Sequence, residues 1–262
     1  MRIRGRYSAA GIILVAVLSA GPSAGFDTGF YSVPLRDFSP AVYGAREARY
    51  LVFSSDENFS LPGTPFQRVE STRRVAGGVE VRVRSGAANP AGGGNRAGLT
   101  SDTRLLAITS PEIRNIAAKF SGRKDPVPAV TRFVFDHITR KTEGIPIVSA
   151  REVLKSRTGD CTEHAVLSVA ILRALGIPSR AMVGMILSES FRAERNVFVF
   201  HMWAEAWTGG RWVLADATRP GQEQPQRYIA FACHSLRAEM PLEYLGAVSA
   251  IRDLSVRLVG NQ

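Results

Sequence analysis

The sequence predicts an α+β fold, in which helices pack on an antiparallel sheet. Two observations predict it. From Cys161 to Ala174, apolar side chains recur at steps of three and four residues, which is the spacing of an α-helix. Residues 197–218 instead place aromatic and β-branched residues on both sides of Gly209-Gly210, which is typical of a β-hairpin.

The predicted helix puts a cysteine at its first turn. Asp160 or Thr162 can cap the start, and Gly176 followed by Pro178 ends the helix. The free amide groups of a first turn carry partial positive charge, and cysteines in that position can have pKa values of roughly 3.5 to 7.5. The same amides can donate to a developing oxyanion. We therefore expect Cys161 to be a nucleophile; a small buried structural cysteine is the alternative.

The predicted hairpin brings a histidine close to an aspartate. If Gly209-Gly210 forms the turn, Trp207 pairs with Trp212, and His201 lies on the same face as Asp216, diagonal to it. Diagonal neighbours have Cα atoms about 7 Å apart, which long side chains can bridge. The aspartate could then accept the imidazole N–H and leave the other ring nitrogen for a thiol. Taken singly, a strand histidine or a strand-end aspartate is more often structural.

These residues belong to four blocks of sequence, which lie in this order along the chain: residues 159–165, 172–180, 201–205 and 212–218. Together the blocks closely resemble the bacterial transglutaminase-like domain, over about residues 105 to 220. In that family, the matching cysteine, histidine and aspartate form a catalytic triad on a papain-like core, in which the nucleophile helix packs on an antiparallel sheet. The resemblance implies that Cys161, His201 and Asp216 form the triad here. One position departs from the family: Ala217 stands where a proline often follows the aspartate.

The resemblance implies acyl transfer without a cofactor. Cys161 would attack an amide carbonyl, His201 would move the proton, and Asp216 would orient the imidazole. The acyl-enzyme then reacts with one of two nucleophiles. Reaction with water is typical of a cysteine peptidase or amidase, and reaction with an amine is typical of a cross-linking transglutaminase. We expect hydrolysis of a protein or peptide substrate. The alternatives are cross-linking and a non-catalytic binding or scaffold module of the cell envelope.

Two neighbours of the expected triad are candidates for substrate binding. His164 lies three residues beyond Cys161 on the same helix, and Trp203 follows His201 on the same strand face. His164 could shape substrate entry. Trp203 could form one wall of the cleft or fill the core instead.

Other kinds of site find little support in the sequence. The two cysteines, Cys161 and Cys233, have no C-x-x-C spacing, and the four histidines form no H-E-x-x-H pattern, so we expect no metal. We also expect both thiols to be free, because a disulfide between them would consume the nucleophile, and we expect Cys233 to be at least half buried.

The first 25 residues predict export to the periplasm or secretion. Arg2, Arg4 and Arg6 precede an apolar run from residue 9 to 20, and small residues follow near position 24, as in a cleaved signal peptide. An uncleaved anchor is the alternative, but the run is short for a span of about 20 residues. We expect no transmembrane span in the mature chain.

The net charge of the whole chain is +10, and removal of the three leader arginines lowers it to +7. Such a chain could associate with anionic cell-envelope polymers, although a solvated basic surface is the simpler explanation. We expect no nucleic acid as a partner, because the arginines are scattered and no recognition motif is present.

The remaining sequence divides into two parts. Residues 26–100 predict a β-rich N-terminal region and a Gly-rich linker, and residues 101–262 the catalytic domain. The strands expected in the first part cover residues 49–53, 66–70, 73–75 and 79–83. The helices expected before Cys161 cover residues 110–120, 129–141 and 149–156.

Overall fold

The computed structural model describes residues 32–86, 96–141, 147–234, 236–237 and 254–260. The predicted signal peptide and most of the Gly-rich linker lie outside the described residues. The strands are β1 (Ser32–Arg36), β2 (Glu47–Ser54), β3 (Gln67–Val75), β4 (Gly78–Gly86), β5 (Ser179–Phe191), β6 (Glu194–Thr208), β7 (Arg211–Ala215), β8 (Tyr228–His234) and β9 (Leu254–Val259). The helices are α1 (Pro111–Ala118), α2 (Val127–His137), α3 (Ala150–Ser156) and α4 (Cys161–Ala174), with 3₁₀ turns η1 (Pro40–Tyr43) and η2 (Pro225–Arg227). The predicted α+β class is confirmed.

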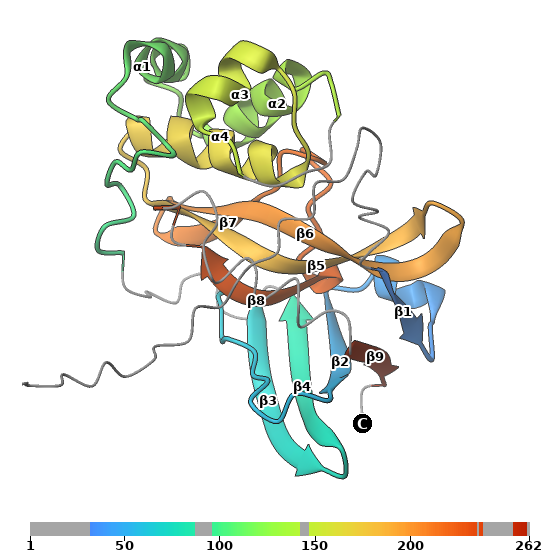
Figure 1. The fold of residues 1–262 in the computed structure, drawn as a ribbon. Coiled ribbons are helices and arrows are strands. Elements are labelled where there is room, and N and C mark those ends of the chain that lie inside the picture. The colour runs from blue at the N-terminus through green and yellow to red at the C-terminus, as the bar shows by residue number, and fades with distance from the viewer. Residues whose placement is uncertain (1–31, 87–95, 142–146, 235, 238–253, 261–262) are drawn as a thin grey trace, which may run out of the picture.

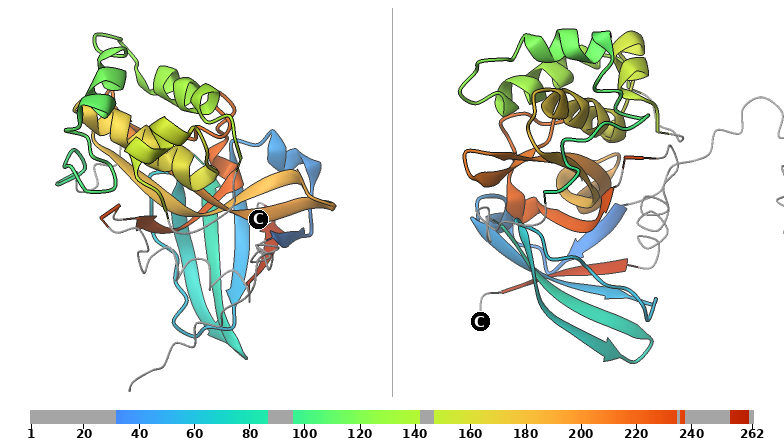
Figure 2. Two further views of the ribbon diagram at one scale, coloured as in Figure 1. Left: turned by 45° about the horizontal axis from the view of Figure 1, so that its top comes forward. Right: turned by 90° about the vertical axis from the view of Figure 1, so that its left-hand side faces the viewer.

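The helices and strands form separate layers. All four helices lie on one side of the β5–β6–β7 part of the sheet, whereas β2, β3 and β4 extend away on the other side (Figures 1 and 2). Helix α4 is the innermost of the helices: every residue from Thr162 to Arg173 is buried. A helix that is buried all round needs neighbours on each side, and here α1, α2 and α3 cover it while β5 and β6 support it.

The strands form a single sheet in the order β3-β4-β2-β9-β1-β6-β5-β8, with β7 on the free edge of β6. The β1–β9 pair is parallel, and the other pairs are antiparallel. Strand β9 comes from the predicted catalytic part, yet it pairs with β2 from the N-terminal part. The predicted division into two parts stays a prediction.

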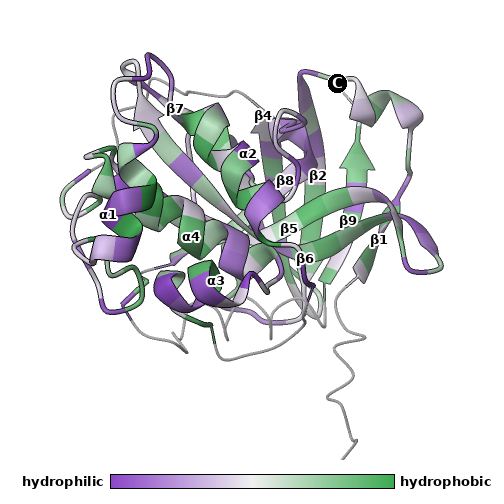
Figure 3. Ribbon diagram, turned by 90° about the horizontal axis from the view of Figure 1, so that it is seen from above, coloured by the Kyte–Doolittle hydropathy of each residue, from purple (hydrophilic) through white to green (hydrophobic). Residues whose placement is uncertain are grey.

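Two large apolar clusters hold these layers together. One lies between the helices and the sheet and has α4 at its centre; the other lies between β2, β4 and β9 on one side and β5 and β6 on the other. Figure 3 shows the hydrophobic residues that run along β5 and β6 beneath the helices. The position of α4 on the sheet is thus fixed by burial on both of its sides.

Several predicted elements are confirmed, including the hairpin of β3 and β4, helix α1 and helix α3. Helix α2 ends at His137, four residues earlier than predicted, because Ile138 takes up an extended conformation. Strand β5 was not predicted. In the part of the chain that the structure describes, no helix has the length and apolar character needed to cross a membrane.

Candidate active site

Asp160 fixes the start of α4 and with it the position of Cys161. Its carboxylate accepts the backbone N–H of Thr162 at 2.8 Å, and the Glu163 carboxylate accepts the backbone N–H of Asp160 at 3.0 Å. This reciprocal arrangement is a capping box. Gly159 has to be glycine, because a Cβ atom there would lie 2.3 Å from the Cβ atom of Glu163.

The β6–β7 hairpin has the predicted register. Trp207 pairs with Trp212, and the pairing continues to Ala204 with Ala215. Gly209 and Gly210 have φ angles of 58° and 77°, the left-handed values that a two-residue hairpin turn requires at both positions. The rings of Trp207 and Trp212 pack edge to face with centroids 5.8 Å apart, so the predicted cross-strand pair is confirmed.

This register brings His201 and Asp216 into contact. Asp216 directly follows β7, and its Oδ2 atom lies 2.7 Å from Nε2 of His201. Three further donors hold the carboxylate. The Tyr228 hydroxyl donates to Oδ2 at 2.8 Å, and the Thr218 backbone N–H and hydroxyl donate to Oδ1 at 2.9 and 2.7 Å. Both carboxylate oxygens of Asp216 are therefore held by hydrogen bonds.

These contacts decide which nitrogen of His201 carries the proton. Burial alone would raise the pKa of Asp216, but His201 and the hydroxyls of Thr218 and Tyr228 outweigh it and hold the pKa well below its usual value. The ionised carboxylate can only accept hydrogen bonds. Nε2 of His201 must then be the protonated nitrogen, and Nδ1 is left with a lone pair that can take a proton.

The two side chains lie beside a break in the sheet. Strand β1 pairs with β6 as far as Val199, and β7 pairs with it from Ala204, so within the described ranges residues 200–203 have no strand on that edge. At this break, the backbone amide of Met202 lies near enough to the Cys161 side chain to lower the pKa of its thiol. Cys161 therefore lies next to the strand residue that follows His201. The thiol and the imidazole themselves form no hydrogen bond.

The expected low pKa of the Cys161 thiol is not found. Burial raises the pKa well above its usual value, and the negative charges of Asp160, Glu163 and Asp216 raise it further. The Met202 amide acts in the opposite direction but is outweighed. A low pKa was expected from the position of Cys161 at a helix terminus alone. In the folded protein, tertiary packing desolvates the sulfur and places carboxylates near it, and both effects raise the pKa.

Two buried residues of the first turn of α4 also have shifted pKa values. Burial and the nearby Asp160 carboxylate raise the pKa of Glu163 to about 8. Burial lowers the pKa of His164 to about 4. The His164 ring is 1% exposed; Nδ1 lies against the carbonyl oxygen of Asp160, and Nε2 lies 3.5 Å from Nζ of Lys141. His164 is thus a neutral side chain that packs on the capping turn.

Trp203 lies beneath the candidate triad. Its indole is 2% exposed, stacks on the His201 ring with centroids 6.1 Å apart, and meets the Tyr228 ring edge to face at 5.0 Å. Trp203 and His164 are therefore both buried, and their contact with a substrate stays a prediction.

Sequence reasoning missed three residues of the site, namely Met202, Thr218 and Tyr228. Thr218 could have been found, because a threonine two residues after an aspartate often donates to its carboxylate in a local turn. Tyr228 carries no comparable signal. It reaches Asp216 from the start of β8, on a segment that passes through an irregular turn and η2.

Cys233 differs from its expected environment. Within the described residues, Cys161 and Cys233 form no disulfide with each other, and Cys233 is exposed, whereas we expected it to be at least half buried. Within the described ranges, no group of three His, Cys, Asp or Glu side chains is placed to hold a metal ion.

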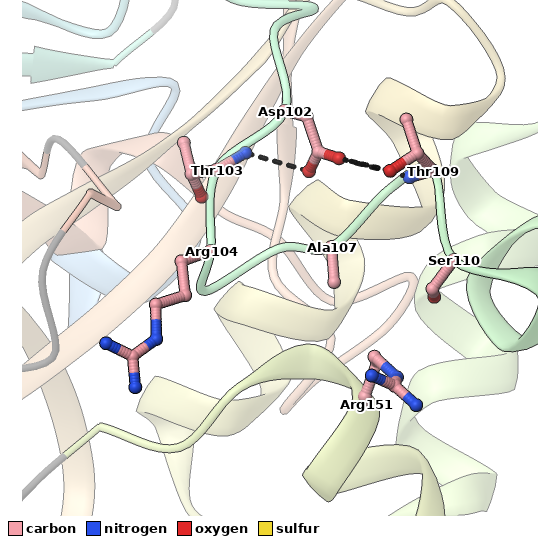
Figure 4. Close-up of a pocket in the computed structure, with 7 residues that line it drawn as sticks. All are labelled: Asp102, Thr103, Arg104, Ala107, Thr109, Ser110 and Arg151. Atoms are coloured by element: carbon pink, nitrogen blue, oxygen red, sulfur yellow. Dashed lines mark hydrogen bonds between the residues drawn. The ribbon is translucent and has the colours of Figure 1, made fainter.

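A separate surface hollow of about 540 Å³ lies before α1 and contains none of the candidate triad. Figure 4 shows its lining residues, Asp102, Thr103, Arg104, Ala107, Thr109, Ser110 and Arg151. The Asp102 carboxylate accepts hydrogen bonds from the loop itself, including the amide and the hydroxyl of Thr109. These bonds explain how the loop is held without assigning it a ligand.

Part of the chain is similar to a known protein family. Residues 113–217 match the family model of the transglutaminase-like superfamily. No curated protein matches the chain. Among solved structures, a candidate cysteine protease from Cytophaga hutchinsonii is 18% identical, with 82% of this chain and 84% of that chain covered and a TM-score of 0.48.

Two further solved structures are similar. The periplasmic domain of TgpA from Pseudomonas aeruginosa is 17% identical, with 76% of this chain and 78% of that chain covered and a TM-score of 0.49. Red sea bream transglutaminase is 10% identical, with 79% and 52% covered and a TM-score of 0.35. The segment from residue 113 to 217, which contains Cys161, His201 and Asp216, is thus the part of the chain that matches the transglutaminase-like superfamily.

Proposed function

We propose that the protein is an exported, thiol-dependent acyl-transfer enzyme that cleaves peptide or amide bonds through an acyl-enzyme on Cys161. One observation carries the proposal: the 2.7 Å hydrogen bond between His201 Nε2 and the buried Asp216 carboxylate, one strand residue away from the Met202 amide that acts on the pKa of Cys161. The bond leaves His201 Nδ1 as the proton acceptor. A fully buried, ionised carboxylate that is hydrogen-bonded to a histidine is hard to explain by stability alone.

The raised pKa of Cys161 favours proton transfer during the attack over a thiolate formed beforehand. Nδ1 of His201 takes the thiol proton while the sulfur adds to the amide carbonyl, and the resulting imidazolium gives that proton to the leaving amine. The C–N bond breaks and a thioester remains. Water then attacks the thioester, His201 accepts a proton from it, and the carboxylic acid and the free thiol are released. Throughout, Asp216 stabilises the imidazolium without taking its proton.

The first turn of α4 can supply one oxyanion donor. The Asp160 side chain already accepts the backbone amides of Thr162 and Glu163, and the Asp160 carbonyl accepts that of His164. The amide of Cys161 itself is the remaining one of this turn. We assign the oxyanion to this amide.

Hydrolysis is favoured over transfer to an amine. An acyl-enzyme reacts with water by default unless a site is built to exclude it. Trp203 and Trp212, at 2% and 1% exposure, are packed against protein side chains and present almost no indole surface that could shelter an acyl group. Cross-linking of proteins is the second candidate, supported by the superfamily itself.

The test uses wild-type protein, Cys161→Ala and the matched control Cys233→Ala, which removes the other thiol. A Gln-containing peptide set is supplied together with a labelled primary amine in the millimolar range. We expect cleaved or deamidated product from the wild-type protein and from Cys233→Ala, and none from Cys161→Ala. Product that mostly carries the amine label would replace the hydrolase proposal by the cross-linking one. Equal product from Cys161→Ala would reject both and favour the non-catalytic binding module.

The sequence supports the location of this activity. The basic, leader-like start of residues 1–25 supports export to the periplasm or secretion, and the chain's positive charge suits association with anionic envelope polymers. A protein or peptide of the cell envelope is accordingly the proposed substrate class.

A further inference from the structure

We propose that Tyr228 is a positioning residue of the active site, which acts through Asp216 by fixing the carboxylate oxygen that faces His201. The inference rests on the proposed acyl transfer and adds a fourth residue to it. Neither the triad pattern nor the matched family segment includes Tyr228, since that segment ends at residue 217.

The hydrogen-bonding capacity of the Asp216 carboxylate is fully used. An ionised carboxylate has about four lone-pair directions, two on each oxygen. On Asp216, Thr218 occupies both directions of Oδ1, and His201 and Tyr228 share Oδ2. With four donors in place the group cannot rotate. Without the Tyr228 hydroxyl, one direction of the oxygen that holds the imidazole would be empty, in a place where Asp216 is fully buried.

The phenol ring is itself held firmly. Tyr228 is 3% exposed, and its ring packs against Trp203 at 5.0 Å and lies 6.1 Å from the His201 ring. Its backbone pairs with Ile186 of β5. Tyr228, Trp203 and His201 thus form one cluster of rings, from which the phenol O–H and His201 Nε2 both reach the Asp216 carboxylate.

The backbone before Tyr228 is anchored on both sides. Arg227 donates from Nη2 to the carbonyl oxygen of Leu187 at 2.6 Å, and the Tyr50 hydroxyl donates to the carbonyl oxygen of Gln226 at 2.7 Å. Tyr50 belongs to β2, so the N-terminal β-rich region supports the residue that supports Asp216. This gives the region a role in the site although it contributes no triad residue.

The hydroxyl keeps its proton over the working range of pH. Burial and the Asp216 charge raise the pKa of Tyr228 well above its usual value. It therefore stays a hydrogen-bond donor to Oδ2 and does not compete with Cys161 or His201 in proton transfer. This distinguishes a positioning residue from a catalytic acid.

The experiment compares Tyr228→Phe with the matched control Tyr43→Phe, whose hydroxyl bonds Asn196 at 2.9 Å and does not touch Asp216. Tyr228→Phe keeps the ring and removes one hydroxyl. We expect kcat to fall roughly tenfold, the size of one lost hydrogen bond to a charged group, with little change in KM. The low-pH limb of kcat/KM should move to higher pH, because a carboxylate with one donor fewer holds the imidazolium more strongly. Tyr43→Phe should match the wild type in kcat and in the position of the low-pH limb of kcat/KM.

A second readout needs no substrate. With ¹⁵N-labelled histidine, the proton on His201 Nε2 should give a downfield NMR signal in the wild type that moves in Tyr228→Phe and not in Tyr43→Phe. An unmoved signal together with an unshifted pH limb would overturn the proposal, even if the rate fell. A wild-type protein without turnover but with a signal that moves would instead reject the proposed function and leave the positioning role standing.

If Tyr228→Phe does not fold, a measurement on the wild-type protein still tests the proposed role of Tyr228. With ¹³Cζ-labelled tyrosine, one resonance shifts when Asp216 is replaced by asparagine, and we assign it to Tyr228. In the wild-type protein this resonance should remain that of a neutral phenol above the pH range in which ordinary tyrosines ionise. Ionisation of that phenol near pH 10 would show that its hydroxyl is not held by the Asp216 carboxylate and would overturn the proposal.

Discussion

Asp160 caps the helix that Cys161 begins, and its carboxylate raises the pKa of the thiol that follows it. The residue that positions the nucleophile therefore also restrains it. Helix capping needs an acceptor oxygen at this position but does not need its negative charge. The two roles of Asp160 can consequently be separated by substitution.

Asp160→Asn should increase the reactivity of Cys161 while preserving α4, because asparagine caps as well as aspartate. Glu163 would ionise more readily once the neighbouring charge is gone, so the double variant with Glu163→Gln should show the larger effect. We expect alkylation by iodoacetamide at pH 7.5 to rise about tenfold in the double variant, equivalent to one pKa unit.

The matched control is Asp56→Asn, since Asp56 accepts the amide two residues ahead, as Asp160 does, but in the N-terminal region. Its alkylation rate should equal that of the wild type. Labelling of exposed Cys233 is subtracted with Cys161→Ala. A double variant no more reactive than the wild type would mean that desolvation alone sets the pKa of Cys161.

Asp216→Asn should keep the fold and reduce kcat by up to about 10⁴, because an amide can favour the wrong tautomer of His201. Asparagine can still accept from Thr218, so the turn after β7 should persist. The checks are steady-state kinetics and thermal unfolding on the same samples. A loss below tenfold would make the His201–Asp216 pair structural.

Stability should fall as the pH rises from 6.5 to 8, because of Glu163. Its pKa is about 8 in the folded protein and near 4.5 when unfolded, so the folded state holds one more proton between these values. The free energy of unfolding then decreases by about 1.4 kcal/mol per pH unit, or roughly 2 kcal/mol over this interval. Between pH 4.5 and 6.5, His164 opposes this trend, since its lowered pKa makes the folded state bind fewer protons.

Glu163→Gln should abolish the decrease above pH 6.5, as measured by denaturant unfolding at pH 6.5, 7.25 and 8. The control is Glu152→Gln, which alters the equivalent residue of the capping box of α3, where the side chain is exposed. That variant should keep the wild-type slope. If the wild-type protein itself shows no slope, the raised pKa of Glu163 is wrong.

The signal-peptide-like sequence of residues 1–25 leads to a further prediction. The native mature protein should begin near residue 25 or 26, as N-terminal sequencing would show. An intact Met1 on protein recovered from the cell envelope would leave the uncleaved anchor as the explanation of residues 1–25. An intact Met1 on cytoplasmic protein would remove export altogether.

Local patterns predicted the elements that carry the candidate triad. The hairpin register followed from two glycines and the alternation of faces, and α4 followed from its apolar spacing and its ends. Strand β5 escaped prediction because it is buried on both faces from Ala181 to Leu187. Such a strand shows no alternation, and Gly184 interrupts it where a Cβ atom would lie 2.1 Å from the carbonyl oxygen of Ile229.

The electrostatics of the site could not be predicted in the same way. The pKa of Cys161 depends first on burial, and the pKa of Asp216 depends on burial and on contacts with His201 and Tyr228, which lie 15 and 12 residues away along the chain. Both effects arise from tertiary contacts that have no local signature. The sequence therefore predicted that His201 and Asp216 lie close together, whereas the pKa values of the site residues required the tertiary structure.

The placement of β9 has a consequence for how the chain is made. Val256 pairs with Val52 of β2 on one side and with Leu35 of β1 on the other, so the latest strand is inserted between the two earliest. While the ribosome is still synthesising the chain, β1 and β2 each keep an unpaired edge until residue 259 has emerged. Such long-range closure is slow, and open strand edges invite pairing with other chains. The nascent protein should accordingly depend on a holding chaperone for far longer than its helical segment requires.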